Sequence, residues 1–412
     1  MKLPLGQLRL ASETAAGASL AGASLAGDVG QRRGSPALGA PHPCLRAVAG
    51  PPPGSSEFRC RMAAVGDSLR AEGVGAIVLV DSEFVAVDVR DFLLALARRW
   101  PAGSFISRQL AAQVIDHRSH DAGGYTPRFA ELLERSLGRG IDALPVKLVH
   151  WSGENHHLGR ADAAVRLLDE LAAFDLPPGR RVMLWGRGQA GNVLALLLRL
   201  LAADAAAVER FFSAARIYYR LPATGLVDVP VWQRAWQLLT RYSDRLAHQT
   251  FDVVTFGTPP RYTWQHPPAD RLLHFVHHRP TTGVASHLAR LPLRIDDLRE
   301  ASGGDYIQQL AVTGTETPPS RFAWRSWLAD RRLGELLDVR DGQSSVAERL
   351  ACGRRLPDAG ATLLVDYGPP SGAVSEHLAG HAVYTRREWL LFHAEQVAQR
   401  LGSQARSSAH AA

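Results

Sequence analysis

The residues best suited to chemistry lie in a glycine-rich turn near the middle of the chain. Residues 181–198 read Arg-Val-Met-Leu-Trp-Gly-Arg-Gly-Gln-Ala-Gly-Asn-Val-Leu-Ala-Leu-Leu-Leu, so a strand pattern ends in glycines and an apolar helix pattern follows at once. In the motif G-x-S-x-G, a turn of this kind exposes a nucleophilic serine, and small residues on either side let the backbones approach. Gly186 and Ala190 are those small residues, but Gly188 occupies the serine position. The turn has the frame of a nucleophile elbow without its hydroxyl.

The same turn matches a second motif, G-x-G-x-x-G, through Gly186, Gly188 and Gly191. That motif sets a dinucleotide pyrophosphate on a helix N-terminus, but it needs a second strand and a ribose-binding acid within a unit of roughly 30 residues. The next strand pattern begins only at residue 251, and the nearby acids Asp204 and Glu209 lie on helical pattern. The context favours the elbow, and nucleotide binding remains an alternative.

Further blocks along the chain resemble α/β-hydrolases of the lipase/esterase type, over about residues 75–402. The resemblance covers an early strand, the end of the strand after it, the Phe-Gly-Thr-Pro segment behind the nucleophile helix, and the histidine loop. These blocks are, in that order, Gly75-Ala-Ile-Val-Leu-Val, Trp151-Ser-Gly-Glu-Asn-His-His, Thr255-Phe-Gly-Thr-Pro-Pro-Arg-Tyr and Gly380-His-Ala-Val-Tyr-Thr.

The resemblance implies a histidine and an acid that follow the elbow in the chain. His381 stands at the position of the family's catalytic histidine, with His377 close to it. Asp305, in Gly303-Gly304-Asp-Tyr-Ile, suits the acid because it lies between the fifth and sixth strand patterns. The rival acids are Asp296, Asp297 and Asp366.

Two departures from the family pattern concern the chemistry itself. Gly188 replaces the serine, so no covalent acyl-enzyme can form by the usual route. Asp81-Ser82 stands where the family has His-Gly, and the Asp81 carboxylate would place negative charge near a developing oxyanion. Glycine at the elbow also removes backbone strain of about 1–3 kcal/mol.

We therefore expect a catalytically impaired hydrolase-like protein that binds a small apolar or ester-like ligand, or a protein partner, in the former active site. One alternative is an active ester hydrolase that uses a displaced nucleophile or a histidine-activated water. Ser82 and Ser152, both at strand ends, are the hydroxyls considered for that role. The other alternative is the nucleotide-binding protein described above.

The elements that must position these residues follow an alternating strand and helix pattern. It predicts an α/β fold with a mainly parallel sheet, helices on both faces, and two long insertions at 208–250 and 281–355 that form a cap. The six predicted strands are 76–80, 146–151, 181–185, 251–256, 272–277 and 361–366. The predicted helices are 89–99, 128–137, 160–174, 189–207, 322–337 and 386–401.

The N-terminal region has a different composition. Residues 1–70 are rich in Ala, Gly, Ser and Pro, which predicts a disordered low-complexity tail before a hydrolase-like domain at 71–405. Met62 is an alternative start. No apolar signal-peptide core is read at the N-terminus, and the longest apolar run is too short to span a bilayer. With three cysteines and no disulfide framework, these features lead us to expect a cytoplasmic protein.

Charge and histidine patterns predict few other partners. The net charge is +7, but the arginines are scattered among acids and form no basic stripe with aromatics, so nucleic acid is not expected. Histidines cluster at 150, 156 and 157 and again at 274, 277 and 278. Adjacent histidines on a strand point to opposite faces, so we expect neither a metal site nor a cofactor, and interpret these residues as caps of strand ends.

Overall fold

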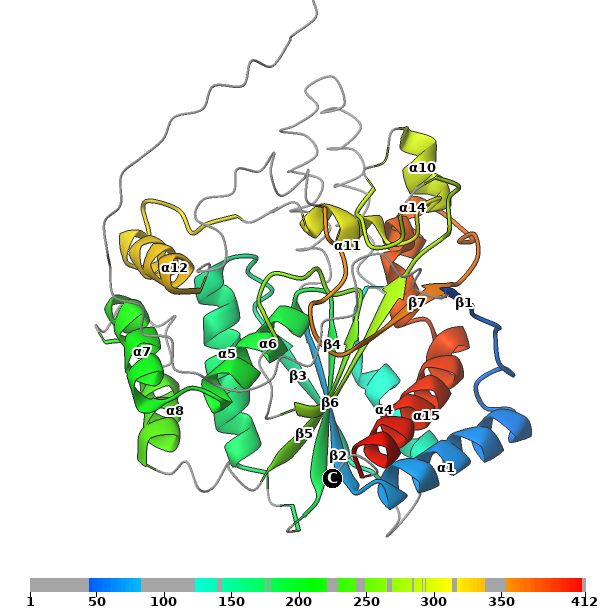
Figure 1. Cartoon of the computed structure of the whole chain (residues 1–412), viewed down its shortest axis with the longest axis horizontal. Helices are drawn as coiled ribbons and strands as arrows, with labels where there is room; N and C mark the ends of the chain where they lie inside the picture. Colours follow the sequence, from blue (N-terminus) through cyan, green and yellow to red (C-terminus); the bar gives the residue numbers. More distant parts are fainter. Residues whose placement is uncertain are drawn as a thin grey trace, which may run out of the picture. The chain divides into compact units, whose positions relative to one another are not determined.

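The fold is described from a computed structural model of the chain (Figure 1). The residues that it describes are 44–82, 123–138, 143–174, 176–177, 179–220, 229–241, 249–264, 269–283, 285–290, 292, 294–312, 317–337 and 353–409. The helix expected at 89–99 lies outside these residues, as does the tail up to residue 43.

A single seven-stranded sheet forms the centre of the fold, in the order β1-β7-β6-β5-β4-β2-β3. Every pairing between neighbouring strands is parallel. The predicted α/β fold class is therefore confirmed, and so are all six predicted strands. The strands are β1 (Cys44–Arg46), β2 (Val74–Ser82), β3 (Val146–Trp151), β4 (Arg181–Arg187), β5 (Thr250–Phe256), β6 (Ala269–His277) and β7 (Ala361–Asp366).

Helices cover both faces of the sheet, as the sequence pattern predicts (Figure 1). One face carries α5 (His157–Ala172), α6 (Ala190–Leu201), α7 (Ala205–Tyr219), α8 (Val229–Arg241) and α12 (Trp324–Leu337). The other carries α1 (Ser56–Ala71), α4 (Pro127–Leu137) and α15 (Leu390–Ala409). Shorter helices follow β6 and β7: α10 (Ile295–Glu300), α11 (Tyr306–Ala311), α14 (Val374–His377), and the 3-10 helices η3 (Leu378–Tyr384) and η4 (Arg387–Trp389).

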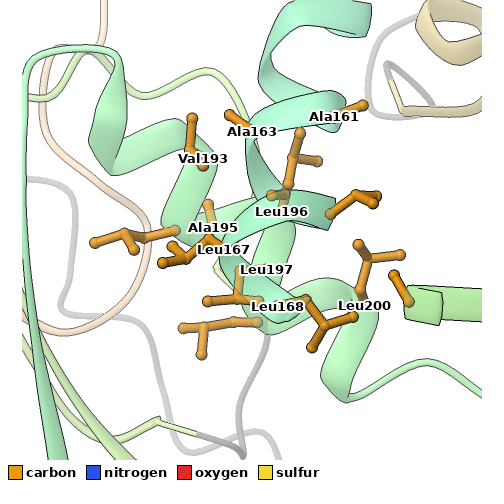
Figure 2. Close-up of a cluster of buried hydrophobic side chains, with 14 of the residues drawn as sticks. Ala161, Ala163, Leu167, Leu168, Val193, Ala195, Leu196, Leu197 and Leu200 are labelled. Carbon is orange, nitrogen blue, oxygen red and sulfur yellow. The ribbon is translucent and has the colours of Figure 1, made fainter. Parts of the chain in front are cut away.

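Two apolar cores, one on each face, hold the layers together. Figure 2 shows part of the first, where Leu167 and Leu168 of α5 pack near Leu196, Leu197 and Leu200 of α6. Helix α6 is buried almost all round because it lies between the sheet and the outer helices, which explains its uninterrupted apolar sequence. This burial fixes the helix that follows the glycine-rich turn.

The insertion helices thicken the α5 face of the molecule. Trp232 of α8 is buried; its ring stacks on Tyr219 of α7 at a centroid distance of 4.9 Å, and its Nε1 donates to Asp162 of α5 at 2.7 Å. Helix α12 contacts both α5 and α7. The described parts of the predicted insertions thus contain helices, and α7, α8 and α12 pack as an outer layer beside α5. No described helix is long and apolar enough to cross a membrane.

The N-terminal boundary differs from the prediction. Residues 44–70, which composition assigned to a disordered tail, include β1 and nearly all of α1. Phe58, Met62, Val65 and Leu69 of α1 are buried in the second core. These four residues follow helical spacing, but the surrounding bias toward Ala, Gly, Ser and Pro masked that signal.

Candidate functional site

The glycine-rich turn joins β4 to α6 at the carboxyl edge of the sheet. Gly188 has φ of +55°, in the left-handed region that favours glycine. Its backbone N–H donates to the Phe256 carbonyl at 2.9 Å, and its carbonyl accepts from the Gly191 N–H at 3.2 Å. The chain reverses sharply here, with the backbone held against the end of β5. The local geometry is that of a strand-to-helix elbow.

The flanking glycines allow close approach between the helix and its surroundings. A side-chain carbon on Gly186 would lie 2.8 Å from the Leu194 side chain, and one on Gly191 would overlap the side chain of Thr258. Asn192 of α6 strengthens the same contact, because its side chain donates to the Pro259 carbonyl at 2.9 Å. Packing therefore accounts for the glycines at 186 and 191.

The acids considered for nucleotide binding have other partners. Asp204 caps α7 by accepting from the Ala207 N–H at 2.7 Å, and Glu209 accepts from Trp236 Nε1 at 3.1 Å. Near the end of the neighbouring strand β2, the Asp81 carboxylate accepts from the backbone N–H of Tyr125. Each of these three acids thus already has a structural partner in the fold.

Asp305 is fully buried and is the N-cap residue of α11, in the loop after α10. Its carboxylate accepts three hydrogen bonds: from His381 Nδ1 at 2.7 Å, from the Tyr384 hydroxyl at 3.1 Å, and from the Gln308 backbone N–H at 2.9 Å. Burial by itself would raise the pKa of Asp305, but His381 and the hydrogen bonds outweigh burial and lower that pKa. The carboxylate is ionised at neutral pH.

His381 lies in η3, after β7, and is almost fully buried. Because Asp305 is a carboxylate, it accepts a hydrogen bond from the Nδ1–H of His381; in the tautomer with this single ring proton, Nε2 is an acceptor. Nε2 has no hydrogen-bond partner in the described part of the chain. The structure therefore brings two of the three predicted site residues into direct contact. A histidine that is oriented in this way by a carboxylate has the geometry of a general base.

The rival residues are placed elsewhere. Asp297 accepts from the backbone of Arg294 at the start of α10, Asp296 is exposed beside Arg299, and Asp366 accepts from the Gly368 N–H at 2.8 Å. His377 is buried in α14. Of the predicted acids, Asp305 is the one whose carboxylate bonds to His381.

Residues that the sequence reasoning missed hold this pair in position. The Tyr384 hydroxyl accepts from the His277 backbone N–H at 2.8 Å while it donates to Asp305. Burial, and then the Asp305 charge, raise the pKa of Tyr384 well above its ordinary value, so it remains a donor. The His277 ring bonds the Gly380 carbonyl at 2.9 Å, and burial lowers its pKa to about 4. The neutral ring ties the end of β6 to the histidine loop.

Arg355 adds a positive charge behind Asp305. It is fully buried, and its Nη2 donates to the His277 carbonyl at 2.9 Å. Burial lowers the pKa of Arg355 to about 10, which leaves it charged at neutral pH, and it interacts electrostatically with Asp305. The buried carboxylate and guanidinium thus partly balance one another's charge.

The charge expected at Asp81 is balanced as well. Its Oδ1 lies 3.8 Å from Nη1 of Arg187, and both side chains are buried. The same nitrogen of Arg187 donates to the Gly123 carbonyl at 2.6 Å. We expected Asp81 to oppose an oxyanion because its carboxylate was taken as an uncompensated charge. Arg187, at the end of the adjacent strand β4, supplies a compensating positive charge. Arg187 in turn is turned inward, to Asp81 and Gly123.

The hydroxyls differ in how suitable they are as nucleophiles. Ser152 is exposed, and its Oγ accepts from the Glu154 N–H at 3.4 Å, as in an ordinary turn. The side chain of Ser82 lies outside the described residues. The sequence reasoning overlooked Thr258, which is buried and whose hydroxyl has no hydrogen-bond partner in the described structure. In the sequence, the feature that could have pointed to Thr258 was its position directly after Phe256 and Gly257.

Several of the clustered histidines have structural partners. His156 caps α5 by accepting from the Gly159 N–H at 2.9 Å, His157 bonds the Tyr262 hydroxyl at 2.9 Å, and His274 bonds Thr255 at 2.6 Å. His156 therefore caps a helix, where we expected a strand-end cap. Within the described ranges, no group of three or more His, Cys, Asp or Glu side chains is arranged to hold a metal ion.

The chain matches no protein-family model, no curated protein and no solved structure. Its description therefore depends on its own residues: an α/β fold with an all-parallel sheet of seven strands, a glycine elbow, and a buried His–Asp pair at the carboxyl edge.

Proposed function

We propose that this chain is an α/β-hydrolase-like protein of the lipase/esterase type that does not form an acyl-enzyme. In this proposal it binds a small apolar or ester-like ligand beside His381. The observation that carries the proposal is the buried hydrogen bond between His381 and Asp305, combined with a glycine at the elbow. The order elbow, acid, histidine along the chain agrees with that class.

The absence of a side chain at Gly188 determines what the site does. Covalent catalysis needs an Oγ or Sγ at the elbow, and glycine supplies neither. The His381 ring nevertheless keeps a free Nε2 acceptor in a buried setting. An unpaired buried acceptor costs about 1–3 kcal/mol, so a ligand or water that donates a hydrogen bond there is favoured. The pair then serves to bind a ligand rather than to activate a nucleophile.

A second candidate function uses the same nitrogen differently. A water molecule hydrogen-bonded to His381 Nε2 could be activated by the His381–Asp305 pair and attack an ester directly. The observation that favours this candidate is that the pair is fully assembled and that the Asp305 carboxylate is held ionised. In this case hydrolysis proceeds without any covalent intermediate.

Ester hydrolysis by matched variants tests the proposal. Wild type, Gly188→Ser, Gly188→Ala and Gly188→Ser/His381→Ala are assayed with p-nitrophenyl esters of short and long chains. We expect no His381-dependent hydrolysis in wild type, a gain in Gly188→Ser, and loss of that gain in the double variant. Gly188→Ala carries similar backbone strain without a hydroxyl, so it controls for structural effects and stays inactive.

A fluorophosphonate probe that labels activated serine and threonine hydroxyls separates the alternatives. We expect it to label Gly188→Ser and to leave wild type unlabelled. Wild-type hydrolysis that requires His381, without labelling, would establish the activated water. Wild-type labelling would establish a displaced nucleophile, and peptide mapping would then decide between Thr258 and the strand-end serines. If Gly188→Ser folds but neither hydrolyses esters nor reacts with the probe, the hydrolase-like reading of the site is wrong.

A further inference from the structure

The outward side of α12 and the turn before it form an unusual surface, which we call the α12 patch: Phe322, Trp324, Arg321, Arg325, Arg331 and Arg332. Phe322 is 99% exposed and Trp324 is 53% exposed; they are the largest exposed apolar side chains in the described structure. Single exposed apolar residues are ordinary, but two aromatics two positions apart are less so.

The local backbone keeps these aromatics exposed. The Ser320 hydroxyl accepts from the Phe322 N–H at 3.3 Å, and the Ser320 carbonyl accepts from the Ala323 N–H at 2.9 Å. The helix begins at Trp324, and the Trp327 N–H donates to the Ala323 carbonyl at 3.0 Å. Phe322 is thus displayed by a hydrogen-bonded turn at the start of a helix.

The inward side of α12 is firmly attached to the body. Asp330 accepts from the Leu158 N–H at 2.8 Å, at the start of α5, and lies 3.3 Å from His156 Nδ1. Ala329 and Leu333 are fully buried in the first core. Figure 1 shows α12 on the outside of the helical layer, beside α7 and α5. The orientation of the helix, and hence of its aromatic side, is therefore fixed.

The charges at the α12 patch are predominantly positive. The arginines at 321, 325, 331 and 332 are accompanied by two acids, of which Asp330 is turned inward and Glu335 pairs with Arg331 at 3.1 Å. Arg325 lies over the Trp324 ring at 5.5 Å and Arg331 over the Trp327 ring at 5.9 Å. Guanidinium groups beside amphipathic aromatics suit a surface with an apolar interior and anionic headgroups.

We propose that the α12 patch binds the surface of an anionic lipid bilayer. Phe322 and Trp324 enter the headgroup and upper acyl region, and the arginines contact the anionic headgroups. The helix lies on the membrane, consistent with a chain whose described helices include none able to span it. This inference does not depend on the proposed function of the His381–Asp305 site.

Vesicle co-sedimentation tests the proposal on the full chain. The probes are phosphatidylcholine vesicles with and without phosphatidylserine. We expect wild type to bind the anionic vesicles, to bind neutral ones far less, and to be released as salt is raised. Phe322→Ser/Trp324→Ser should weaken binding about tenfold or more. Val48→Ser removes another exposed apolar side chain, which is 74% exposed, and should leave binding unchanged.

A matched charge pair supplies the second arm of the test. Arg331→Gln should weaken binding about fivefold. Arg135→Gln removes an arginine that likewise pairs with a glutamate four residues away on an exposed helix surface, and it should have no effect. Binding that is absent in wild type, or equal for both vesicle types, overturns the proposal. So does a change of oligomeric state in the aromatic variant without a change in vesicle binding, which would make the patch a contact between copies of the chain.

Discussion

The imidazole Nδ1 of His381 lies 2.7 Å from Oδ2 of Asp305, although the two residues are 76 positions apart in the chain. Asp305 follows β6 and His381 follows β7, and these strands are adjacent in the sheet. The hydrogen bond therefore joins two neighbouring strand-end loops. It is a structural link whatever chemistry the site performs.

The first prediction concerns the stability that depends on Asp305. Asp305→Ala should lower the free energy of unfolding by about 3–5 kcal/mol, because it leaves the buried donors of His381, Tyr384 and Gln308 without their acceptor. Urea unfolding followed by circular dichroism measures this. Asp296→Ala, which removes an exposed carboxylate beside Arg299, should cost less than about 0.5 kcal/mol. Equal effects of the two variants would show that the three hydrogen bonds to Asp305 do not stabilise the fold.

The second prediction separates backbone strain from close packing at glycines. Gly191→Ala should destabilise the fold by about 1–3 kcal/mol because the added carbon overlaps Thr258. Gly179→Ala, at a φ of +79° with open space around it, should cost only the strain of the left-handed backbone, about 1 kcal/mol. Thermal and urea unfolding of both variants give the comparison. A Gly191→Ala variant as stable as wild type would show that the α6 contact relaxes freely.

A third prediction addresses the buried pair of Asp81 and Arg187. Asp81→Asn alone should cost about 3–5 kcal/mol, because it leaves the Arg187 charge buried without its partner. Adding Arg187→Met should restore part of that loss, with a coupling energy of about 1–3 kcal/mol in a double-mutant cycle. The exposed pair of Glu131 and Arg135 is the reference, with an expected coupling below about 0.5 kcal/mol. Additive effects at Asp81 and Arg187 would show that they do not interact.

The fourth prediction is that the free energy of unfolding falls as the pH is lowered toward 4. Burial lowers the pKa of His274 and of His393 to about 3 each, whereas both titrate near 6.5 when unfolded. Between these values the unfolded chain binds more protons, so stability falls as pH falls, by up to about 1.4 kcal/mol per pH unit for each histidine. The lowered pKa of Asp305 acts separately, because its contribution is lost only as pH falls below about 3.8.

Urea unfolding between pH 7.5 and pH 4.5 measures that slope. His393→Gln keeps an acceptor for the Tyr367 hydroxyl, which lies 2.7 Å from His393 Nε2, but removes the titrating group. We expect this variant to reduce the slope of the free energy of unfolding against pH. His150→Ala, at an exposed position on β3, is the control for replacing a histidine side chain. A stability that does not change over this range would show that the buried histidines are not held neutral by the fold.

Much of the fold and part of the site could be predicted from local pattern. The strands at 146–151 and 361–366 match the prediction to the residue, because short β-branched apolar runs bounded by turn residues have few alternatives. Asp305 and His381 were selected by their order in the chain relative to the elbow, and the structure brings them together. Their role in catalysis or binding remains a prediction.

Other features depended on contacts that no local pattern carries. The strand β1 and helix α1 lay hidden in a biased composition. Burial against α15 stabilises α1, and pairing with β7 holds β1. Tyr384 and Arg355 look like ordinary loop residues in the sequence, yet both bond to His277 at the end of β6. The Asp81–Arg187 pair forms because β2 and β4 are neighbours in the sheet.

The sequence by itself determined most of the strands and helices, and that the elbow has no nucleophile, because periodicity and residue identity are local properties. Only the tertiary structure decided which strand ends meet at the carboxyl edge. Residues distant in the chain lie together at that edge. The strand order determines which of them are in contact, and burial of both faces of the sheet sets that order. The balance of charge around Asp81 and the ionised state of Asp305 follow from that order.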